Sequence, residues 1–167
     1  MKIYIHTDLE GISGIDCIEM MSKSDPRHQF ARERLMADLN AAIEGVFEGG
    51  ATEVMVVDRH GGANNFIPEL LDKRVTVDHK LNDLWTGALD ETFDGTIIIG
   101  AHAMAGTMNA FLDHTQSSLK GFNYYINGKR TGEIGQWATM CAHFKVPVLM
   151  VSGDEAACAE ARAFLGP

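Results

Sequence analysis

The sequence predicts an α/β protein, specifically a three-layer αβα sandwich with a mostly parallel sheet and a β-hairpin insertion. Short apolar runs of the kind found in buried parallel strands alternate along the chain with longer segments of helical periodicity. Helices that connect successive strands leave those strands parallel and cover both faces of the sheet. The sequence contains no repeat, low-complexity segment or linker, so we expect residues 1–167 to form a single α/β domain.

The first half of the chain is expected to contribute two helices and three strands. The strand segments are short and rich in β-branched residues, and they are residues 2–7, 52–57 and, more briefly, 74–77. The first helix is expected to begin at the Ser-Asp-Pro stretch of residues 24–26, an N-cap followed by Pro at the first helical position. It should run to Glu48, where two glycines stop it, with Phe30 and Leu35 on its apolar side. A second helix is expected over residues 81–89.

The second half of the chain repeats the alternation and adds a hairpin. The expected strands are residues 96–99 and 147–151, and the expected helices are residues 132–144 and 155–165. Asp154 is placed to cap the last of these helices. Within residues 122–131 the Asn127-Gly128 pair separates two extended segments, which is a strong signal for a two-residue type I′ turn.

Composition and charge narrow the classes of function. Hydrophobic residues make up 46% of the chain and charged residues 22%, as in an ordinary globular protein. The net charge of −9 argues against a nucleic-acid partner, because phosphate binding needs clustered Lys and Arg. No apolar stretch approaches the roughly 20 residues that span a bilayer, and no signal-peptide pattern opens the chain, so we expect no membrane association. The cysteines are few and widely spaced, which favours reduced thiols and a cytoplasmic location.

Metal-binding residue types follow the predicted strands, at the point where each strand ends. Asp8 and Glu10 leave the first strand, Asp58 and His60 leave the second, and His102 leaves the strand over residues 96–99. In open α/β sheets the carboxyl ends of the strands meet at one edge, where binding sites form. Glu133, at the start of a predicted helix just after the hairpin, is placed to reach the same edge. We therefore expect one site built from these strand ends.

The donor types suit divalent transition metals. Asp8 and Glu10 are two residues apart, so in extended backbone their side chains point to the same side. With Glu133 they make three carboxylates, and His60 and His102 add two imidazoles, a mixture that zinc, manganese or cobalt accepts. A single catalytic zinc uses about three protein ligands, whereas a carboxylate-bridged pair of ions uses all of these. Such a pair polarises a carbonyl and activates a water, which is the chemistry of amide hydrolysis.

Each of these residues has a simpler explanation when taken singly. Asp8 is also what a loop or helix N-cap requires, and Glu10 is also what an exposed loop contains. His60 can bond a nearby backbone carbonyl, and His102 can be a buried core histidine. The metal hypothesis is favoured because, if each residue had a separate structural role, their common position at one edge of the sheet would be a coincidence.

The remaining histidines divide into three groups. Those expected to be exposed and without a role are His28, His79 and His143. His6, inside the first strand, stays ambiguous. His114 follows the loop that begins at His102, so as a non-ligand near the metals it can carry protons or stabilise an oxyanion. A loop histidine paired with Asp113 is an equally simple interpretation.

Motifs of several other enzyme classes are missing. Residues 11–14 (GISG) do not complete GxGxxG, and no GxxxxGK[ST] occurs, so the phosphate cradle of a nucleotide-binding protein is absent from the sequence. No GxSxG occurs, which weakens a serine-hydrolase interpretation. HExxH, the helix-borne zinc motif of many proteases, is also missing.

The order of the short motifs resembles a known family. DLEGISG after the first strand, VDRH, GAHA, the histidine a dozen residues later and GEIG together resemble the DppA-type D-aminopeptidases, peptidase family M55. The similarity runs through essentially the whole chain, including FNYYING and PVLMVSGD. It implies an enzyme with two zinc ions per subunit that removes N-terminal D-amino acids, notably D-alanine, from short peptides. It also implies a homo-oligomer, a ring of ten subunits.

The resemblance also assigns roles to residues. The family's metal ligands match Asp8, Glu10, His60, His102 and Glu133, and its bridging glutamate matches Glu10. Its catalytic histidine, described as a nucleophile, matches His114. The chemistry of the residues leaves this role open, because a water activated by the metals would serve as nucleophile equally well and His114 would then shuttle protons. D-selectivity follows from the resemblance alone.

The chain departs from the family pattern in two respects. Family members are longer, so we expect a C-terminal part beyond residues 166–167 that builds subunit contacts and closes the site. The segment between His102 and His114 is one residue longer than the family pattern, which bears on substrate choice. The alternatives are another dinuclear metallohydrolase acting on an amide or phosphate ester, and a non-catalytic peptide-binding or scaffold protein. The five intact ligand positions argue against the last alternative.

Overall fold

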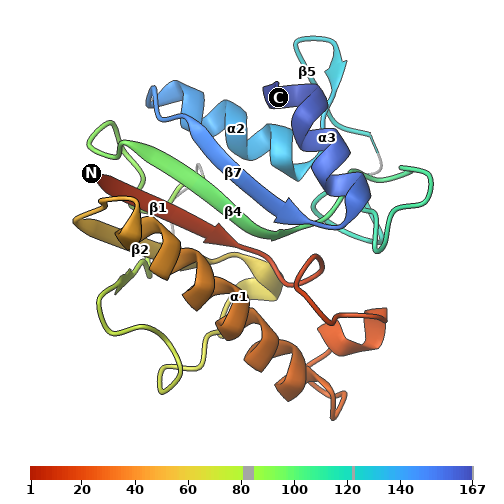
Figure 1. The fold of residues 1–167 in the computed structure, drawn as a ribbon. Coiled ribbons are helices and arrows are strands. Elements are labelled where there is room, and N and C mark those ends of the chain that lie inside the picture. Colours follow the sequence, from red (N-terminus) through yellow and green to blue (C-terminus); the bar gives the residue numbers. More distant parts are fainter. Residues whose placement is uncertain (81–84, 122, 167) are drawn as a thin grey trace.

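A five-stranded parallel sheet forms the centre of the structure (Figure 1). The computed structural model describes residues 1–80, 85–121 and 123–166. The strands are β1 (Lys2–Thr7), β2 (Glu53–Asp58), β3 (Thr76–Val77), β4 (Gly95–Ala101) and β7 (Val148–Gly153), in the order β3-β2-β1-β4-β7. Every pairing between neighbours in this sheet is parallel. The predicted α/β fold class is confirmed.

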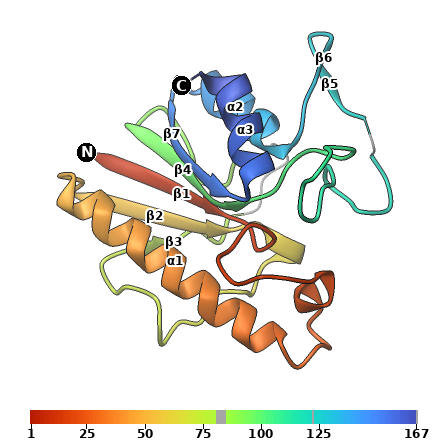
Figure 2. The same cartoon turned by 45° about the vertical axis from the view of Figure 1, so that its right-hand side comes forward.

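Helices cover both faces of the sheet, as parallel strands require (Figures 1 and 2). Helix α1 (His28–Glu48) packs on one face with the odd-numbered β1 residues Ile3 and Ile5. Helices α2 (Glu133–His143) and α3 (Glu155–Leu165) pack on the other face, with Tyr4 among their core partners. Because side chains alternate along a strand, β1 supplies both halves of the core.

The strands are buried because they are central and apolar. All seven residues of β4 (GTIIIGA) are buried, since β4 has strands on both sides and helices above and below. Trp137 of α2 is fully buried, stacks on Tyr4 with ring centroids 5.8 Å apart, and donates its Nε1–H to Thr96 Oγ1 at 3.2 Å. These contacts fix α2, and with it the helix start that carries Glu133, against β1 and β4.

Two predicted local features are confirmed. The hairpin consists of β5 (Tyr125–Ile126) and β6 (Lys129–Arg130), and its turn residues Asn127 and Gly128 have φ values of 51° and 79°. Positive φ at both central positions is what a type I′ turn requires. Asp154 caps α3, accepting the Ala157 N–H on its carboxylate at 2.7 Å.

The start of α1 differs from the prediction. The helix begins at His28 rather than near Pro26, because the Asp25 carboxylate accepts the Arg27 N–H at 2.8 Å and holds residues 25–27 in a turn. His28, predicted to be exposed, is buried and its Nδ1 lies 2.9 Å from the Met20 carbonyl oxygen in the short helix η1 (Ile18–Met21). Phe30, predicted on the apolar side, is 48% exposed.

The prediction of a helix over residues 81–89 is wrong for residues 85–89, the part of the segment that the structure describes. Residues 81–84 lie outside the described residues, and residues 85–89 form a bend and a turn. Trp85 and Gly87 have positive φ, and the Ala88 N–H is donated to the Asp78 carboxylate at 2.6 Å. This contact with the end of β3 replaces a helical hydrogen bond, so the local apolar pattern was overridden by tertiary structure.

The helices of the described residues include none that is both long enough and apolar enough to cross a lipid bilayer.

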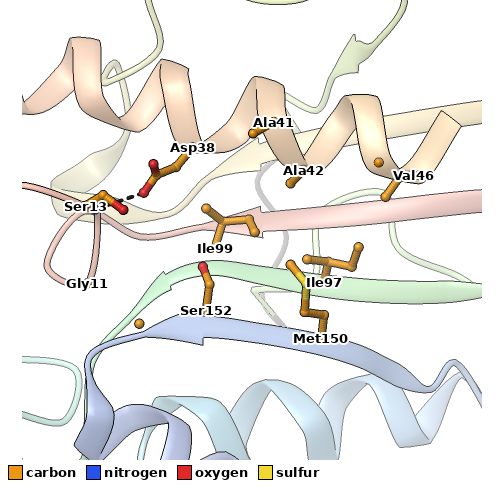
Figure 3. Close-up of a pocket in the computed structure, with 12 residues that line it drawn as sticks. Gly11, Ser13, Asp38, Ala41, Ala42, Val46, Ile97, Ile99, Met150 and Ser152 are labelled. Carbon is orange, nitrogen blue, oxygen red and sulfur yellow. Dashed lines mark hydrogen bonds between the residues drawn. The ribbon is translucent and has the colours of Figure 1, made fainter. Parts of the chain in front are cut away.

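A groove of about 590 Å³ separates α1 from strands β4 and β7 (Figure 3). Ala41 and Ala42 of α1 form one wall, and Ile97, Ile99 and Met150 form the floor. The groove is mostly apolar and lies on the α1 face of the sheet, so it offers packing surface rather than catalytic groups.

The first loop packs directly on the end of β4 at Gly11. Its N–H donates to the Gly100 carbonyl oxygen at 2.9 Å, and a Cβ at this position would overlap the Ala101 carbonyl oxygen. Only a residue without a side chain allows this approach. The contact matters for the site because Asp8 and Glu10 lie in this loop and His102 follows Ala101.

We expect Gly11→Ala to lower the free energy of unfolding by about 1–3 kcal/mol, the usual cost of overpacking. The matched control is Gly45→Ala at an exposed position in the last turn of α1, where a Cβ meets nothing within 4 Å. This control should raise the free energy of unfolding by about 0.5–1 kcal/mol, because alanine is the better helix former. Urea unfolding of both variants measures the difference, and equal stability of the two would contradict the close approach at Gly11.

Candidate metal centre

All five predicted ligands lie together at the carboxyl edge of the sheet. Asp8 and Glu10 stand in the loop after β1, and His60 opens the short helix η2 (His60–Gly62) after β2. His102 directly follows β4, and Glu133 is the first residue of α2. Segments far apart in the sequence thus deliver their side chains to one place, because β1 pairs with both β2 and β4 in parallel.

One half of the cluster forms around His60. Its Nδ1 lies 3.1 Å from Asp8 Oδ1 and 2.9 Å from Glu10 Oε2. The turn that carries it is held by Asp58, whose carboxylate accepts the Asn65 backbone N–H at 2.6 Å and its side-chain N–H at 3.0 Å. Asp58 therefore supports the His60 turn and, among the described residues, belongs to none of the groups able to hold a metal.

The other half of the cluster forms around His102, which is only 2% exposed. Its Nε2 lies 3.4 Å from Asp8 Oδ2 and 3.3 Å from Glu133 Oε1, yet it makes no hydrogen bond of acceptable geometry within the described chain. Its Nδ1 faces the Ala103 carbonyl oxygen at 3.1 Å, so in the neutral ring the proton is favoured on Nδ1 and the lone pair on Nε2. A buried nitrogen lone pair aimed between two carboxylates is suited to a cation.

The side chains can be grouped by the cation they would share. Three groups have ligand atoms within 4.8 Å of one another: Asp8, Glu10 and His60; Asp8, His102 and Glu133; and Glu10, His102 and His114. Asp8 is common to the first two groups, with one carboxylate oxygen facing each histidine. Glu10, to which the family resemblance assigns the bridging role, belongs to the first and the third group.

The carboxylates give the cluster a strong attraction for positive charge. Burial lowers the pKa of both His60 and His102, but the neighbouring carboxylates outweigh burial and raise each pKa to about 10. Burial and the charge of Asp8 raise the pKa of Glu10. The cluster therefore holds protons tightly, and a divalent ion that supplies the same positive charge would displace them from the imidazoles.

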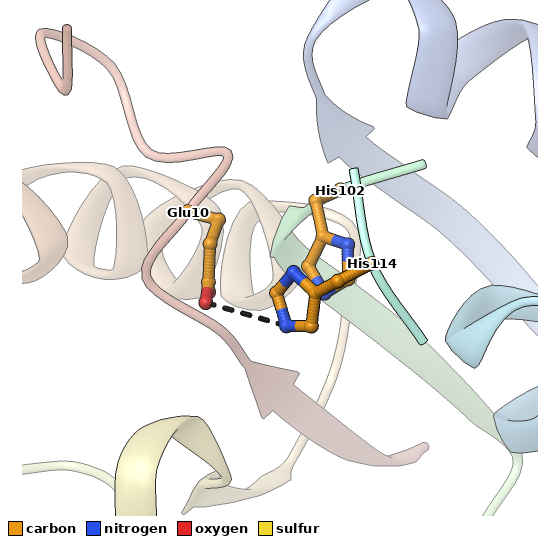
Figure 4. Close-up of side chains that lie close together, drawn as sticks. All are labelled: Glu10, His102 and His114. Atoms are coloured by element: carbon orange, nitrogen blue, oxygen red, sulfur yellow. Dashed lines mark ion pairs between the residues drawn. The ribbon is translucent and has the colours of Figure 1, made fainter. Parts of the chain in front are cut away.

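His114 lies against this cluster (Figure 4). Its ring stacks on that of His102, with centroids 3.9 Å apart and an interplanar angle of 12°. Its Nε2 lies 3.7 Å from Glu10 Oε1 and 3.8 Å from Glu133 Oε1. Burial and the charge of His102 lower the pKa of His114, which favours a neutral imidazole.

The alternative partner of His114, Asp113, is engaged elsewhere. The Asp113 carboxylate accepts the Gly106 N–H at 2.5 Å, and the Nδ1 of His114 instead faces the Leu112 carbonyl oxygen at 3.1 Å. A proton on Nδ1 satisfies that carbonyl and leaves the Nε2 lone pair directed at the cluster. His114 is therefore oriented by backbone toward the predicted ligands.

Two further polar residues reach this edge without having been assigned there. His6 is buried against Trp137, with ring centroids 4.5 Å apart, and burial lowers its pKa to about 4. Glu160 of α3 accepts the Met104 N–H at 2.7 Å. The sequence leaves the role of His6 ambiguous and gives no signal for Glu160, because nothing in the pattern of an amphipathic helix distinguishes such a glutamate from an exposed one.

Comparison with known proteins gives a consistent result. The family model Peptidase_M55, described as D-aminopeptidase, matches residues 1–167. The D-aminopeptidase of Bacillus subtilis (strain 168) is 34% identical over 165 residues, which covers 96% of this chain and 59% of that protein. The solved structure described as the Zn-dependent D-aminopeptidase DppA from Bacillus subtilis, a self-compartmentalizing protease, superposes with a TM-score of 0.88 at 33% identity. That match covers 98% of this chain and 60% of the solved chain, so this chain spans about three fifths of each relative.

Removal of either ligand histidine should reduce metal binding. We expect His60→Ala and His102→Ala each to lower the number of divalent ions bound per chain, because each deletes one imidazole from a different ligand group. His143→Ala is the control, since His143 is exposed at the end of α2. Elemental analysis after dialysis gives the stoichiometry. Unchanged metal content in both ligand variants would refute the assignment.

Proposed function

Because the chain belongs to peptidase family M55, the D-aminopeptidases, we propose that it is a zinc-dependent aminopeptidase that releases N-terminal D-amino acids, of the D-alanine class, from short peptides. The observation that carries this proposal is the convergence of five metal-competent side chains and His114 at one edge of the sheet. These are the positions that match the family's ligands and catalytic histidine.

The residues present fit a pair of zinc ions. Two imidazoles and three carboxylates are donors that zinc accepts, and the buried Nε2 of His102 faces Asp8 and Glu133 without making a hydrogen bond in the described chain. One ion would be held by Asp8, Glu10 and His60, and the other by Asp8, His102 and Glu133. When bound, such a pair of ions polarises the scissile carbonyl and lowers the pKa of a water.

His114 is the proposed catalytic residue. Its pKa is lowered by burial and by His102, so its Nε2 is unprotonated near neutral pH and can act on the substrate. The contact of Nδ1 with the Leu112 carbonyl oxygen and the stacking on His102 hold the ring in one orientation. Both candidate roles begin from this free Nε2, which can either attack the carbonyl itself or take a proton from the attacking water and then deliver that proton to the leaving amine.

The loop that carries His114 also orients one of the proposed metal ligands. Gln116 donates its backbone N–H to Glu133 Oε1 at 2.7 Å, so this carboxylate is oriented from the loop that also carries His114.

The assembly and location belong to the same proposal. A relative with 33% identity is described as self-compartmentalizing, which supports a homo-oligomer, and the family resemblance suggests a ring of ten subunits. The spread of three free cysteines supports a cytoplasmic location. The chain spans about three fifths of the length of these relatives, so their assembly comes to this chain only as a proposal.

The decisive activity test compares two stereoisomers of one dipeptide. We expect the full-length protein, loaded with zinc, to cleave D-Ala-D-Ala and to leave L-Ala-L-Ala intact. Release of alanine, followed by chromatography, measures both reactions. Cleavage of only the L-dipeptide would refute the D-aminopeptidase assignment but keep a metallohydrolase, and cleavage of neither would favour a peptide-binding protein.

His114→Ala should separate catalysis from metal binding. We expect kcat to fall by about 10²- to 10⁴-fold, the usual contribution of a positioned acid–base group, while the zinc content stays at the wild-type value. Paired measurements of kcat and zinc content test this. His79→Ala, an exposed histidine beyond β3, is the control. A His114 variant of full activity would remove the catalytic role, and loss of zinc from it would make His114 a ligand.

A further inference from the structure

Glu160 occupies a junction between two ligand-bearing segments. It lies on α3, which packs beside α2 on the same face of the sheet (Figure 1). His102 reaches this region from the end of β4, and Glu133 reaches it from the start of α2. The Glu160 carboxylate accepts a backbone hydrogen bond from the first segment and packs closely against the second. Among the described residues it belongs to none of the groups of side chains that can hold a metal.

The first contact is with the segment that follows His102. Met104 is the second residue after His102, and its N–H donates to Glu160 Oε2 at 2.7 Å. A carboxylate that accepts a backbone N–H makes a charge-assisted bond, which is stronger and more directional than a neutral one. The bond limits how far the backbone after His102 can move away from α3.

The second contact is with the residue that precedes Glu133. Gly132 is buried and has a negative φ, so its backbone conformation is open to any residue. The space around it, however, has room only for glycine. A Cβ at Gly132 would lie 2.5 Å from Glu160 Oε1 and 2.6 Å from Met104 Cβ. The start of α2, the segment after His102 and the Glu160 carboxylate therefore pack with no space to spare.

Helix α3 also holds the far end of the same loop. Asp154, the N-cap of α3, accepts the Phe111 N–H on Oδ2 at 2.8 Å. Phe111 lies three residues before His114, and the His114 N–H donates to the Ala103 carbonyl oxygen at 3.3 Å. The loop between His102 and His114 is thus attached to α3 near both of its ends, and Glu160 is the attachment nearest to His102.

We propose that Glu160 is a positioning residue of the metal site, which sets the distance between His102 and Glu133 by holding the backbone beside each of them. This role rests on the proposed dinuclear zinc site. It does not extend to His60, because the turn that carries His60 is held by Asp58 and Asn65 on the other side of β1. Loss of Glu160 should therefore weaken one ion and spare the other.

The test is a zinc titration of three variants in competition with a chromophoric chelator. In Glu160→Ala we expect the affinity for one of the two zinc ions to fall by about 10- to 100-fold, which is the usual effect of removing a group that orients a ligand. The affinity for the other zinc ion should not change. Glu160→Gln should recover most of this loss, because its amide oxygen still accepts the Met104 N–H. Glu155→Ala, an exposed glutamate on the same helix, should match the wild type.

The possible outcomes separate this role from general stability and from the function itself. If both zinc affinities of Glu160→Ala equal those of the wild type, the positioning role is overturned. It is also overturned if both affinities fall equally and the Tm of the zinc-free protein falls as well, because that result indicates a general loss of stability. Failure of the Gln variant to recover binding would also overturn it, since the bond to Met104 would then not be the cause. A wild type that binds fewer than two zinc ions would contradict the dinuclear site itself, and this role with it.

Discussion

The site depends on the parallel pairing of β1 with both β2 and β4. Thr7 lies opposite Asp58 on one side and Ile99 on the other, so the three strands end at nearly the same level. The pairing continues past the strands, where the Asp8 N–H donates to Ile99 and the Arg59 N–H donates to Thr7. A register fixed by the buried faces of the strands thus brings together ligands that are about 50 to 100 residues apart in the sequence.

The same convergence concentrates negative charge at a partly buried edge, which is unfavourable unless cations balance it. His60 and His102 supply part of that balance, as their raised pKa values show. Glu133 gains a further contribution from its place in the first turn of α2, where the helix dipole favours a carboxylate. The metal ions proposed for this site would supply the rest of the positive charge.

Local signals predicted most of the fold because they act over a few residues. Three features depend only on residues within their own segments: the apolar run of β4, the Asn127-Gly128 turn and the Asp154 cap. The helix predicted over residues 81–89 was wrong in its described part because Asp78, from outside the segment, takes the Ala88 N–H. His28 was misjudged for the same reason, since its burial depends on the carbonyl of Met20 in η1.

The sequence by itself determined the donor types and the edge at which they meet, because strand ends and side-chain alternation follow from periodicity. Only the tertiary structure decided how the donors are shared. Asp8 faces both histidines, His114 stacks on His102 rather than pairing with Asp113, and Glu160 reaches the loop after His102. These relations are set by the packing of α2, α3 and the loop between His102 and His114, and packing between distant segments leaves no periodic trace in a sequence.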